Sequence, residues 1–119
     1  MKPYLADGTI DADTADWIRD MMAQMANNGQ IAAAFQPSAK VKTECEILYQ
    51  GRVRRIDRCA ELSNAIYLID YKTGKKDEEH QTQVQTYASA LREMTDKEIR
   101  AFLVYLDETG IEVESVSVG

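Results

Sequence analysis

The sequence contains few of the residues that mark a metal-thiolate site, a disulfide framework or a membrane span. Only two of its 119 residues are cysteine and only one is histidine. Cys45 and Cys59 lack metal-ligand spacing, so they are most simply reduced core thiols. No apolar run approaches the ~20 residues of a membrane span, and no charged-then-apolar leader opens the chain. We therefore expect a cytoplasmic protein without membrane contact.

The remaining composition is that of one soluble globular domain. A length of 119 residues is usual for a single domain. Hydrophobic residues make up 45% and charged residues 29%, which is ordinary. The chain shows no internal repeat, low-complexity run or linker. We expect residues 1–119 to form a single domain.

Charge is unevenly distributed along the chain. The net charge of −6 argues by itself against a nucleic-acid-binding protein, because phosphate contacts need Lys and Arg. Between Lys40 and Lys76, however, nine basic and five acidic residues give +4, which leaves −10 for the rest. This basic segment is a candidate nucleic-acid contact, although chance clustering on a solvated face explains it equally well.

Hydrophobic periodicity predicts two helices and five strands. Apolar residues at helical spacing, among them Met21 and Met25, predict a helix over 11–27 that Asn28-Gly29 ends. A second helix is predicted over 80–94, with Val84 and Tyr87 on its apolar face. Strands are predicted at 41–48, 53–61, 65–72, 99–106 and 111–118.

The predicted order is α-β-β-β-α-β-β. Short turns make the first three strands an antiparallel meander, whereas the helix between the third and fourth strands favours a parallel crossover. The order thus predicts an α/β (α+β) domain with a mixed sheet between the two helices.

The turns predict which side chains face each other across the sheet. If the strands turn symmetrically about Ser63-Asn64, Asp57 lies directly opposite Asp70, with Cβ atoms ~5 Å apart. Lys72 is two residues beyond Asp70 and projects from the same face. A similar turn about Gln50-Gly51 places Glu44 opposite Asp57.

Facing carboxylates repel each other unless a cation lies between them. A hard divalent ion such as Mg²⁺ or Mn²⁺ prefers oxygen ligands and would resolve the conflict. A nearby lysine can orient a water molecule or help to remove its proton, which suits phosphodiester hydrolysis. The alternative is a salt-bridged sheet face on which Arg55 and Lys72 pair with the two aspartates. Sheet chemistry alone leaves both interpretations open.

Three motifs carry a resemblance to a known family. They are Arg55-Ile56-Asp57-Arg58, Leu68-Ile69-Asp70-Tyr71-Lys72-Thr73-Gly74-Lys75 and Gln83-Val84-Gln85-Thr86-Tyr87. Together they resemble the RecB-like branch of the PD-(D/E)xK nuclease superfamily, most closely the C-terminal nuclease domain of AddA-type (UvrD/REP-like) helicase–nucleases. The likeness extends from about Val41 to Leu106. It implies a restriction-endonuclease-like α-β-β-β-α-β core, here with an extra C-terminal strand, and an Mg²⁺-dependent deoxyribonuclease, an exonuclease of DNA repair and recombination.

The resemblance also implies roles for the residues of the first two motifs. Asp57, Asp70 and Lys72 correspond to the catalytic set. Asp57, Asp70 and the backbone carbonyl of Tyr71 correspond to the metal ligands. Glu44, whose register depends on an imperfect turn signal, is a weaker third candidate ligand.

The third motif corresponds to one that lies near the DNA in relatives. It assigns Gln83 and Tyr87 to DNA binding, and the basic Arg55 and Lys75 are further candidates. Tyr87 also lies on the apolar face of its helix, so core packing is the alternative for it.

Two departures from the family pattern affect these expectations. Many RecB-like nucleases have an additional histidine ligand on an earlier helix, whereas His80 follows the motif and is expected to be a surface residue at a helix start. The number of metal ions is therefore open. The chain also lacks a G-x-x-x-x-G-K-[ST] motif and hence a motor, so we expect it to be part of a larger helicase–nuclease whose motor is a partner. The alternatives to an active nuclease are a catalytically idle module of this fold, which binds DNA or a motor, and an unrelated interaction domain.

Overall fold

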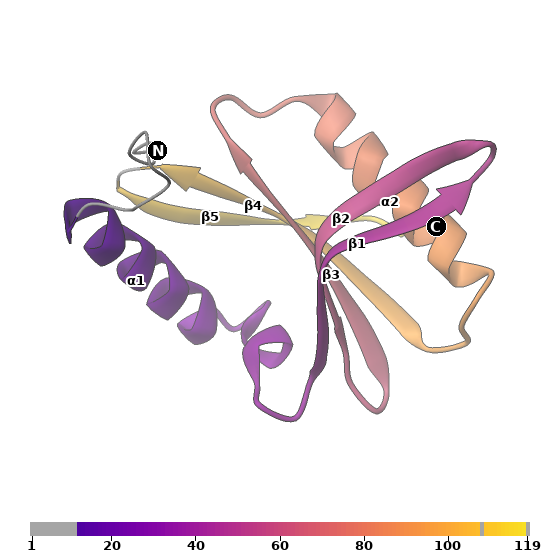
Figure 1. The fold of residues 1–119 in the computed structure, drawn as a ribbon, viewed down its shortest axis with the longest axis horizontal. Coiled ribbons are helices and arrows are strands. Elements are labelled where there is room, and N and C mark those ends of the chain that lie inside the picture. Colours follow the sequence, from indigo (N-terminus) through magenta and orange to yellow (C-terminus); the bar gives the residue numbers. More distant parts are fainter. Residues whose placement is uncertain (1–11, 108, 119) are drawn as a thin grey trace.

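The chain forms a five-stranded mixed sheet with one long helix on each face (Figure 1). The computed structural model describes residues 12–107 and 109–118, with side chains from Ala15 onward. The elements are α1 (Ala12–Asn27), the 3-10 helix η1 (Ala32–Phe35), β1 (Lys40–Tyr49), β2 (Arg52–Glu61), β3 (Ala65–Thr73), α2 (Glu78–Arg92), β4 (Glu98–Asp107) and β5 (Gly110–Val116). None of the helices within these ranges has the length and apolar character needed to cross a membrane.

The topology confirms the predicted order of elements. The strands lie in the order β1-β2-β3-β4-β5. All neighbours are antiparallel except β3 and β4, which are parallel and joined by α2. The predicted helix over 11–27 is present as α1, although residue 11 lies outside the described residues. The mixed sheet and the parallel crossover are as expected from the periodicity.

Two apolar cores lie on the two sides of the sheet. Leu68 and Tyr87 belong to the core under α2, whereas Ile31 and Ile69 belong to the core on the α1 side. Successive residues of β3 therefore fill opposite cores, as expected for a strand that is buried on both faces. Cys45 and Cys59 are free thiols at the edge of the α2-side core, and burial raises the pKa of Cys59 to about 11. A thiol with so high a pKa is unreactive.

The second helix, predicted over 80–94, lies two residues earlier in the structure, at Glu78–Arg92. The helix begins at Glu78 because the Asp77 carboxylate accepts a hydrogen bond from the backbone N–H of Glu79 at 2.9 Å and so caps the first turn. Glu78 and Glu79 add negative charge at the N-terminus, which the helix dipole favours. The helix ends at Arg92, before Met94.

The strand registers agree with the turn arithmetic. Arg58 pairs with Ile69 and Cys59 with Leu68, as a symmetric turn about Ser63-Asn64 requires. Thr43 pairs with Arg58, so β1 and β2 also keep the expected register. The two hairpins therefore bring the predicted site residues to neighbouring positions.

The β1–β2 hairpin bends out of the sheet at its middle. Ile56 and Cys59 both belong to the α2-side core although they are three positions apart, and on a regular strand they would face opposite sides. In β1, Glu44 has a φ of 49°, a left-handed conformation that is unusual in a strand. Beyond this point the two strands part from β3 and run over α2 (Figure 1). The predicted site lies at this divergence.

Candidate active site

Asp57 and Asp70 meet where β2 and β3 diverge. The backbone N–H of Asp57 donates to Asp70 Oδ1 at 3.2 Å, and the backbone N–H of Tyr71 donates to Asp57 Oδ2 at 2.9 Å. Regular pairing between β2 and β3 extends only from Arg58–Ile69 to Glu61–Ile66. Each carboxylate thus bonds to the backbone of the opposite strand just beyond the regular ladder, which fixes both carboxylates between the strands.

The two carboxylates have different surroundings. Asp70 is 7% exposed, the one buried charged residue within the described part of the chain, whereas the Asp57 side chain is 27% exposed. Burial raises the pKa of Asp70, the neighbouring Asp57 carboxyl group raises it further, and Lys72 acts in the opposite direction. A buried carboxylate beside a second one is stabilised in its charged form by a bound cation. The site therefore favours a positive charge.

Lys72 supplies one positive charge to the site. Its Nζ lies 3.0 Å from Asp70 Oδ2 and donates to Gln83 Oε1 at 2.9 Å. Asp70 and Lys72 come from the same face of β3, as predicted, whereas Gln83 comes from the exposed side of α2. Gln83 was predicted as a DNA contact, and the structure brings it into hydrogen-bond contact with Lys72.

Arg55 and Lys75 lie at the exposed rim. One Arg55 guanidinium nitrogen is 3.9 Å from Asp57 Oδ1, and the Arg55 side chain is 57% exposed. Lys75 is exposed in the loop that follows β3. Both positions are open to a large anionic ligand.

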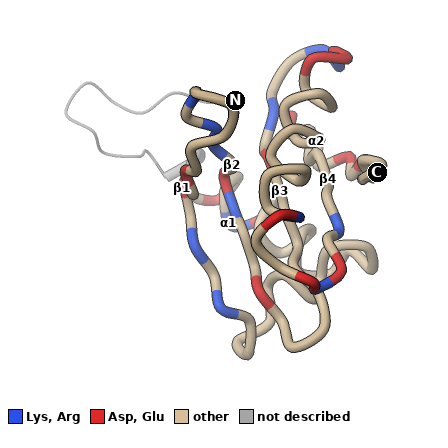
Figure 2. Tube along the Cα trace, turned by 90° about the vertical axis from the view of Figure 1, so that its right-hand side faces the viewer, with Lys and Arg blue, Asp and Glu red and all other residues tan. Residues whose placement is uncertain are grey.

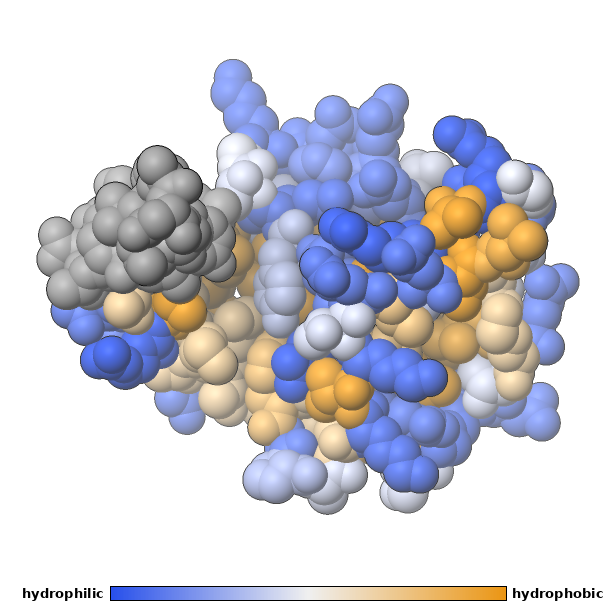
Figure 3. All heavy atoms as spheres, viewed as in Figure 1, coloured by the Kyte–Doolittle hydropathy of each residue, from blue (hydrophilic) through white to orange (hydrophobic). Residues whose placement is uncertain are grey.

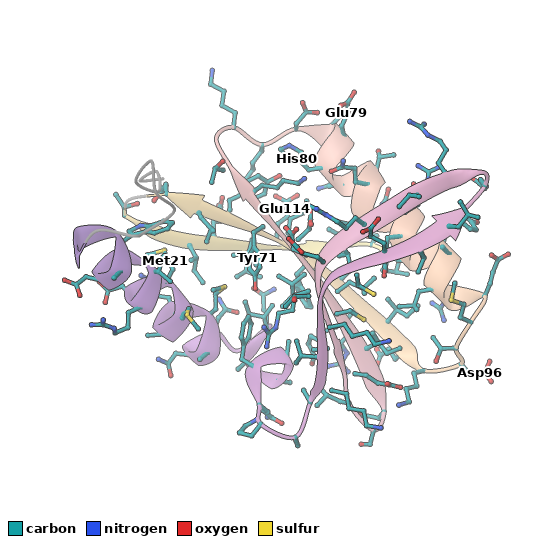
Figure 4. The ribbon with its side chains drawn as sticks, in the orientation of Figure 1. Met21, Tyr71, Glu79, His80, Asp96 and Glu114 are labelled. Atoms are coloured by element: carbon teal, nitrogen blue, oxygen red, sulfur yellow. The ribbon has the colours of Figure 1, made fainter. Side chains whose placement is uncertain are left out.

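The backbone carbonyl of Tyr71 and the carboxylate of Glu44 remain predicted ligands. The Tyr71 side chain packs into the α1-side core, on the other side of the sheet from His80 (Figure 4). Glu44 is in register with Asp57 but exposed. Among the described residues no three or more His, Cys, Asp or Glu side chains are placed to hold a metal ion.

Tyr87 and His80 lie away from the carboxylate pair. Tyr87 is 1% exposed in the core under α2, which agrees with the core-packing interpretation and leaves no surface for direct contact with DNA. Burial raises the pKa of Tyr87, and the nearby Cys45 thiol raises it further. His80 lies at the start of α2, with Nδ1 3.1 Å from the Tyr105 hydroxyl, and it is a helix-start residue as expected.

Glu114 is a polar neighbour of the site that the sequence analysis missed. Leu103 pairs with Asp70 on one side and with Glu114 on the other, so all three lie in one row across the sheet. Glu114 accepts a hydrogen bond from Gln81 and forms an ion pair with Lys76 at 3.3 Å. The hydrogen bond from Gln81 is the main reason why the pKa of Glu114 is lowered. The contacts tie the start of α2 to β5 (Figure 4). The alternation of Glu112 and Glu114 on β5 was the only sequence signal for them.

Comparison with protein families assigns the chain to a superfamily. Residues 4–117 match the model of the PD-(D/E)XK nuclease superfamily. The chain belongs to this superfamily. Its mixed sheet with two helices is consistent with the restriction-endonuclease-like fold, and PD-(D/E)XK nucleases generally use divalent metal ions. No curated protein matches the chain.

Two solved structures resemble this PD-(D/E)XK domain. One, from Eubacterium rectale and named "Putative exonuclease", has a TM-score of 0.55 and 13% identity, and the match covers 96% of this chain and 49% of that one. The other, named SSO0001, has a TM-score of 0.48 and 23% identity over 66% of this chain and 42% of that one. This chain therefore spans about half, or less, of the length of these structures. At these identities the likeness concerns the fold alone.

Proposed function

We propose that the chain hydrolyses DNA phosphodiester bonds with a divalent ion, Mg²⁺ or Mn²⁺, at Asp57 and Asp70. The observation that carries this proposal is the meeting of the two carboxylates at the divergence of β2 and β3, with Lys72 in contact with Asp70. Fold and family support the same reaction. An acid pair with one buried member and an adjacent lysine suits the transfer of a highly charged phosphoryl group.

The donor set fits a hard cation. Asp57, Asp70 and the carbonyl of Tyr71 would hold the ion, since all three offer oxygen. When bound, the ion neutralises charge on the phosphate and makes a nearby water more acidic. Asp70 gains most from such a charge because it is the buried carboxylate of the pair.

Lys72 acts beside the two carboxylates. Its ammonium group now pairs with Asp70, and a cation on that carboxylate would compete for the same oxygen. Gln83 Oε1, which also accepts from Lys72 Nζ, keeps the ammonium group at the site in that event. Lys72 can then donate to a phosphate oxygen or orient the attacking water. Gln83 is in this way a positioning residue for Lys72.

We include in this proposal the branch of the superfamily to which the chain belongs. The motifs from Arg55 to Tyr87 support a RecB-like domain of the AddA type, one part of a repair and recombination helicase–nuclease. Exonuclease action is supported by these motifs, and the similar fold of the Eubacterium rectale protein is compatible with it. DNA and a helicase motor, in the same or a partner chain, are the proposed partners.

A catalytically idle module is the second candidate. The ion pairs Lys72–Asp70 at 3.0 Å and Arg55–Asp57 at 3.9 Å are those expected of a salt-bridged sheet face. They partly neutralise the acid pair without a metal ion. Such a module would bind DNA or a motor and cut nothing.

Cleavage under single-turnover conditions tests the proposal. End-labelled linear DNA is incubated with excess protein and Mg²⁺, Mn²⁺ or EDTA, and Asp70→Asn is compared with the exposed, distant Asp96→Asn (Figure 4). We expect metal-dependent products that Asp70→Asn abolishes and Asp96→Asn retains. Mn²⁺-induced broadening of NMR signals near Asp57 tests metal binding separately. Broadening without cleavage, or DNA binding alone, would support the idle module.

A further inference from the structure

The tip of the β1–β2 hairpin exposes two apolar side chains that belong to neither of the two cores. Leu48 and Val53 are 71% and 64% exposed and pair directly across the two strands. Directly opposite side chains share one face, so they form a single aliphatic patch. Figure 3 shows apolar surface over this hairpin, next to hydrophilic side chains. Because Cys45 and Ile47 turn the other face of the hairpin toward the α2-side core, the patch faces outward.

The turn gives this tip a defined shape. Gln50 and Gly51 have φ angles of 55° and 74°, the left-handed conformation that both residues of a tight type I′ hairpin turn adopt. Leu48 and Val53 are the second residues on each side of that turn. The aliphatic patch is thus presented by a short, regular hairpin.

The charge around the patch favours a polyanion. Between Cys45 and Ile56 the charged residues are three arginines, Arg52, Arg54 and Arg55, and one glutamate, Glu46. The whole chain has a net charge of −6, so this hairpin is a local exception, and its three arginines all lie on β2 (Figure 2). An apolar patch among arginines complements nucleic acid, which offers phosphates beside apolar base faces.

The aliphatic patch and the carboxylate pair share one strand, β2, which carries Val53 and Asp57. Val53 and Arg55 alternate along β2 and so share a face, and Arg55 in turn approaches Asp57 to 3.9 Å. Asp57 is four positions beyond Val53 along the strand, which corresponds to about 13 Å at ~3.3 Å per residue. A B-form strand rises this far in about four nucleotides. A strand with one phosphate at Asp57 would pass Arg55 and reach the tip.

We propose that Leu48 and Val53 form an apolar wedge that packs against the terminal base pair of a DNA end and separates it, while the hairpin arginines hold the flanking phosphates. The proposal rests on the proposed function, since it takes DNA as the ligand, and it adds that the substrate is an end rather than an uninterrupted duplex. Inserted aliphatic side chains are a known way to unstack bases.

Fluorescence of 2-aminopurine tests the wedge. A linear duplex carries this base in its terminal pair, a matched duplex has both ends closed by loops, and EDTA prevents cleavage. Wild-type protein, titrated to its solubility limit, is expected to raise the fluorescence of the open end only. The Leu48→Asn/Val53→Asn double variant is expected to lose this rise and to bind the open end about tenfold more weakly. That factor is about 1.4 kcal/mol, the contribution of about 55 Å² of buried apolar surface.

Met94→Asn is the matched control. Met94 is 61% exposed and lies after the end of α2, outside the hairpin sequence, so its substitution should leave both readouts unchanged. Circular dichroism melts verify that all variants fold. Absence of a fluorescence rise with wild-type protein, or an equal rise with the double variant, overturns the wedge. Because the assay contains no metal ion, either result is independent of whether the chain cuts DNA.

Discussion

At the residue scale, the acid pair is a destabilising feature that local contacts compensate only in part. Burying a carboxylate is costly unless it is paired and hydrogen-bonded. Asp70 receives one backbone N–H and one lysine, yet burial and Asp57 still raise its pKa. Such a mismatch is typical of catalytic groups, whose environment is set by function rather than stability.

Replacing Asp70 by Asn should separate these two effects. The raised pKa in the folded protein means that ionisation of Asp70 costs stability as the pH rises through that pKa, whereas below the unfolded value of about 3.9 the cost vanishes. We therefore expect Asp70→Asn to lower cleavage by at least about a hundredfold. In EDTA at pH 7 its melting temperature should equal or exceed that of the wild type, with a smaller difference at pH 4. Thermal melts at both pH values check this, and a clear loss of stability at pH 7 would contradict the assignment of Asp70 as a strained carboxylate.

Lys72 should matter for turnover rather than for the ion. A lysine has the same sign of charge as the metal and cannot be its ligand, so Lys72→Ala should lower single-turnover cleavage by about a hundred- to a thousandfold. Its Mn²⁺ affinity, measured by calorimetry, should stay within about threefold of the wild-type value. Gln83→Ala should show a smaller loss in the same direction, because Lys72 then lacks its second partner. An equal loss of metal affinity in Lys72→Ala would exclude this role.

The same titration decides the place of Glu44. If Glu44 is a third ligand, the Glu44→Gln variant should weaken Mn²⁺ binding about as much as Asp57→Asn does. As an exposed residue with no role at the ion, it would leave the affinity unchanged.

The facing positions of Asp57 and Asp70 could be predicted from the sequence because a short turn fixes hairpin register. The hydrogen bonds from Asp57 N–H to Asp70 and from Tyr71 N–H to Asp57 could not. They form only because β2 and β3 diverge there, and the divergence depends on how the hairpin packs on α2. The contact of Lys72 with Gln83 likewise depends on the docking of a helix against a sheet, which no local pattern contains.

At the scale of elements, α2 is held between the sheet and the bent hairpin. Its apolar face, with Val84 and Tyr87, packs against β3 and β4, while Cys45 and Ile47 reach it from β1. This contact accounts for the change of face near Ile56, because a straight hairpin would turn these side chains to solvent. The sequence predicted both strands but not the bend, since period-two alternation contains no information on where a strand twists.

Tyr87 should act through the packing of α2. Removing a fully buried aromatic ring costs about 3–5 kcal/mol, so Tyr87→Ala should lower the free energy of unfolding in urea by that amount. Tyr87→Phe removes only the hydroxyl and should cost about 1 kcal/mol, with DNA cleavage retained. A Tyr87→Phe protein that folds normally but has lost cleavage would instead support the DNA contact that the family resemblance implies.

At the scale of the whole molecule, the segment that carries the candidate site is basic, whereas the rest of the chain is acidic. The segment from Lys40 to Lys76 carries +4 and the remaining residues −10. Several of its basic groups are engaged within the protein: Lys72 with Asp70, Lys76 with Glu112 and Glu114, and Arg58 with the carbonyl of Ala34. Few cations are therefore left for phosphates, and an acidic body repels a polyanion at long range.

With DNA in excess, the isolated chain should therefore bind DNA weakly and cut it slowly or not at all, so that products are expected only under the protein excess of the single-turnover assay. A nuclease that works alone normally has a larger positive footprint, because each phosphate contact releases counterions and adds affinity. If a motor delivers the strand, its local concentration replaces intrinsic affinity. Fluorescence anisotropy with labelled single- and double-stranded DNA at ~0.15 M salt measures the affinity under physiological screening. We expect a dissociation constant well above micromolar that falls steeply at lower salt. Sub-micromolar binding would mean that this chain holds its substrate without a motor.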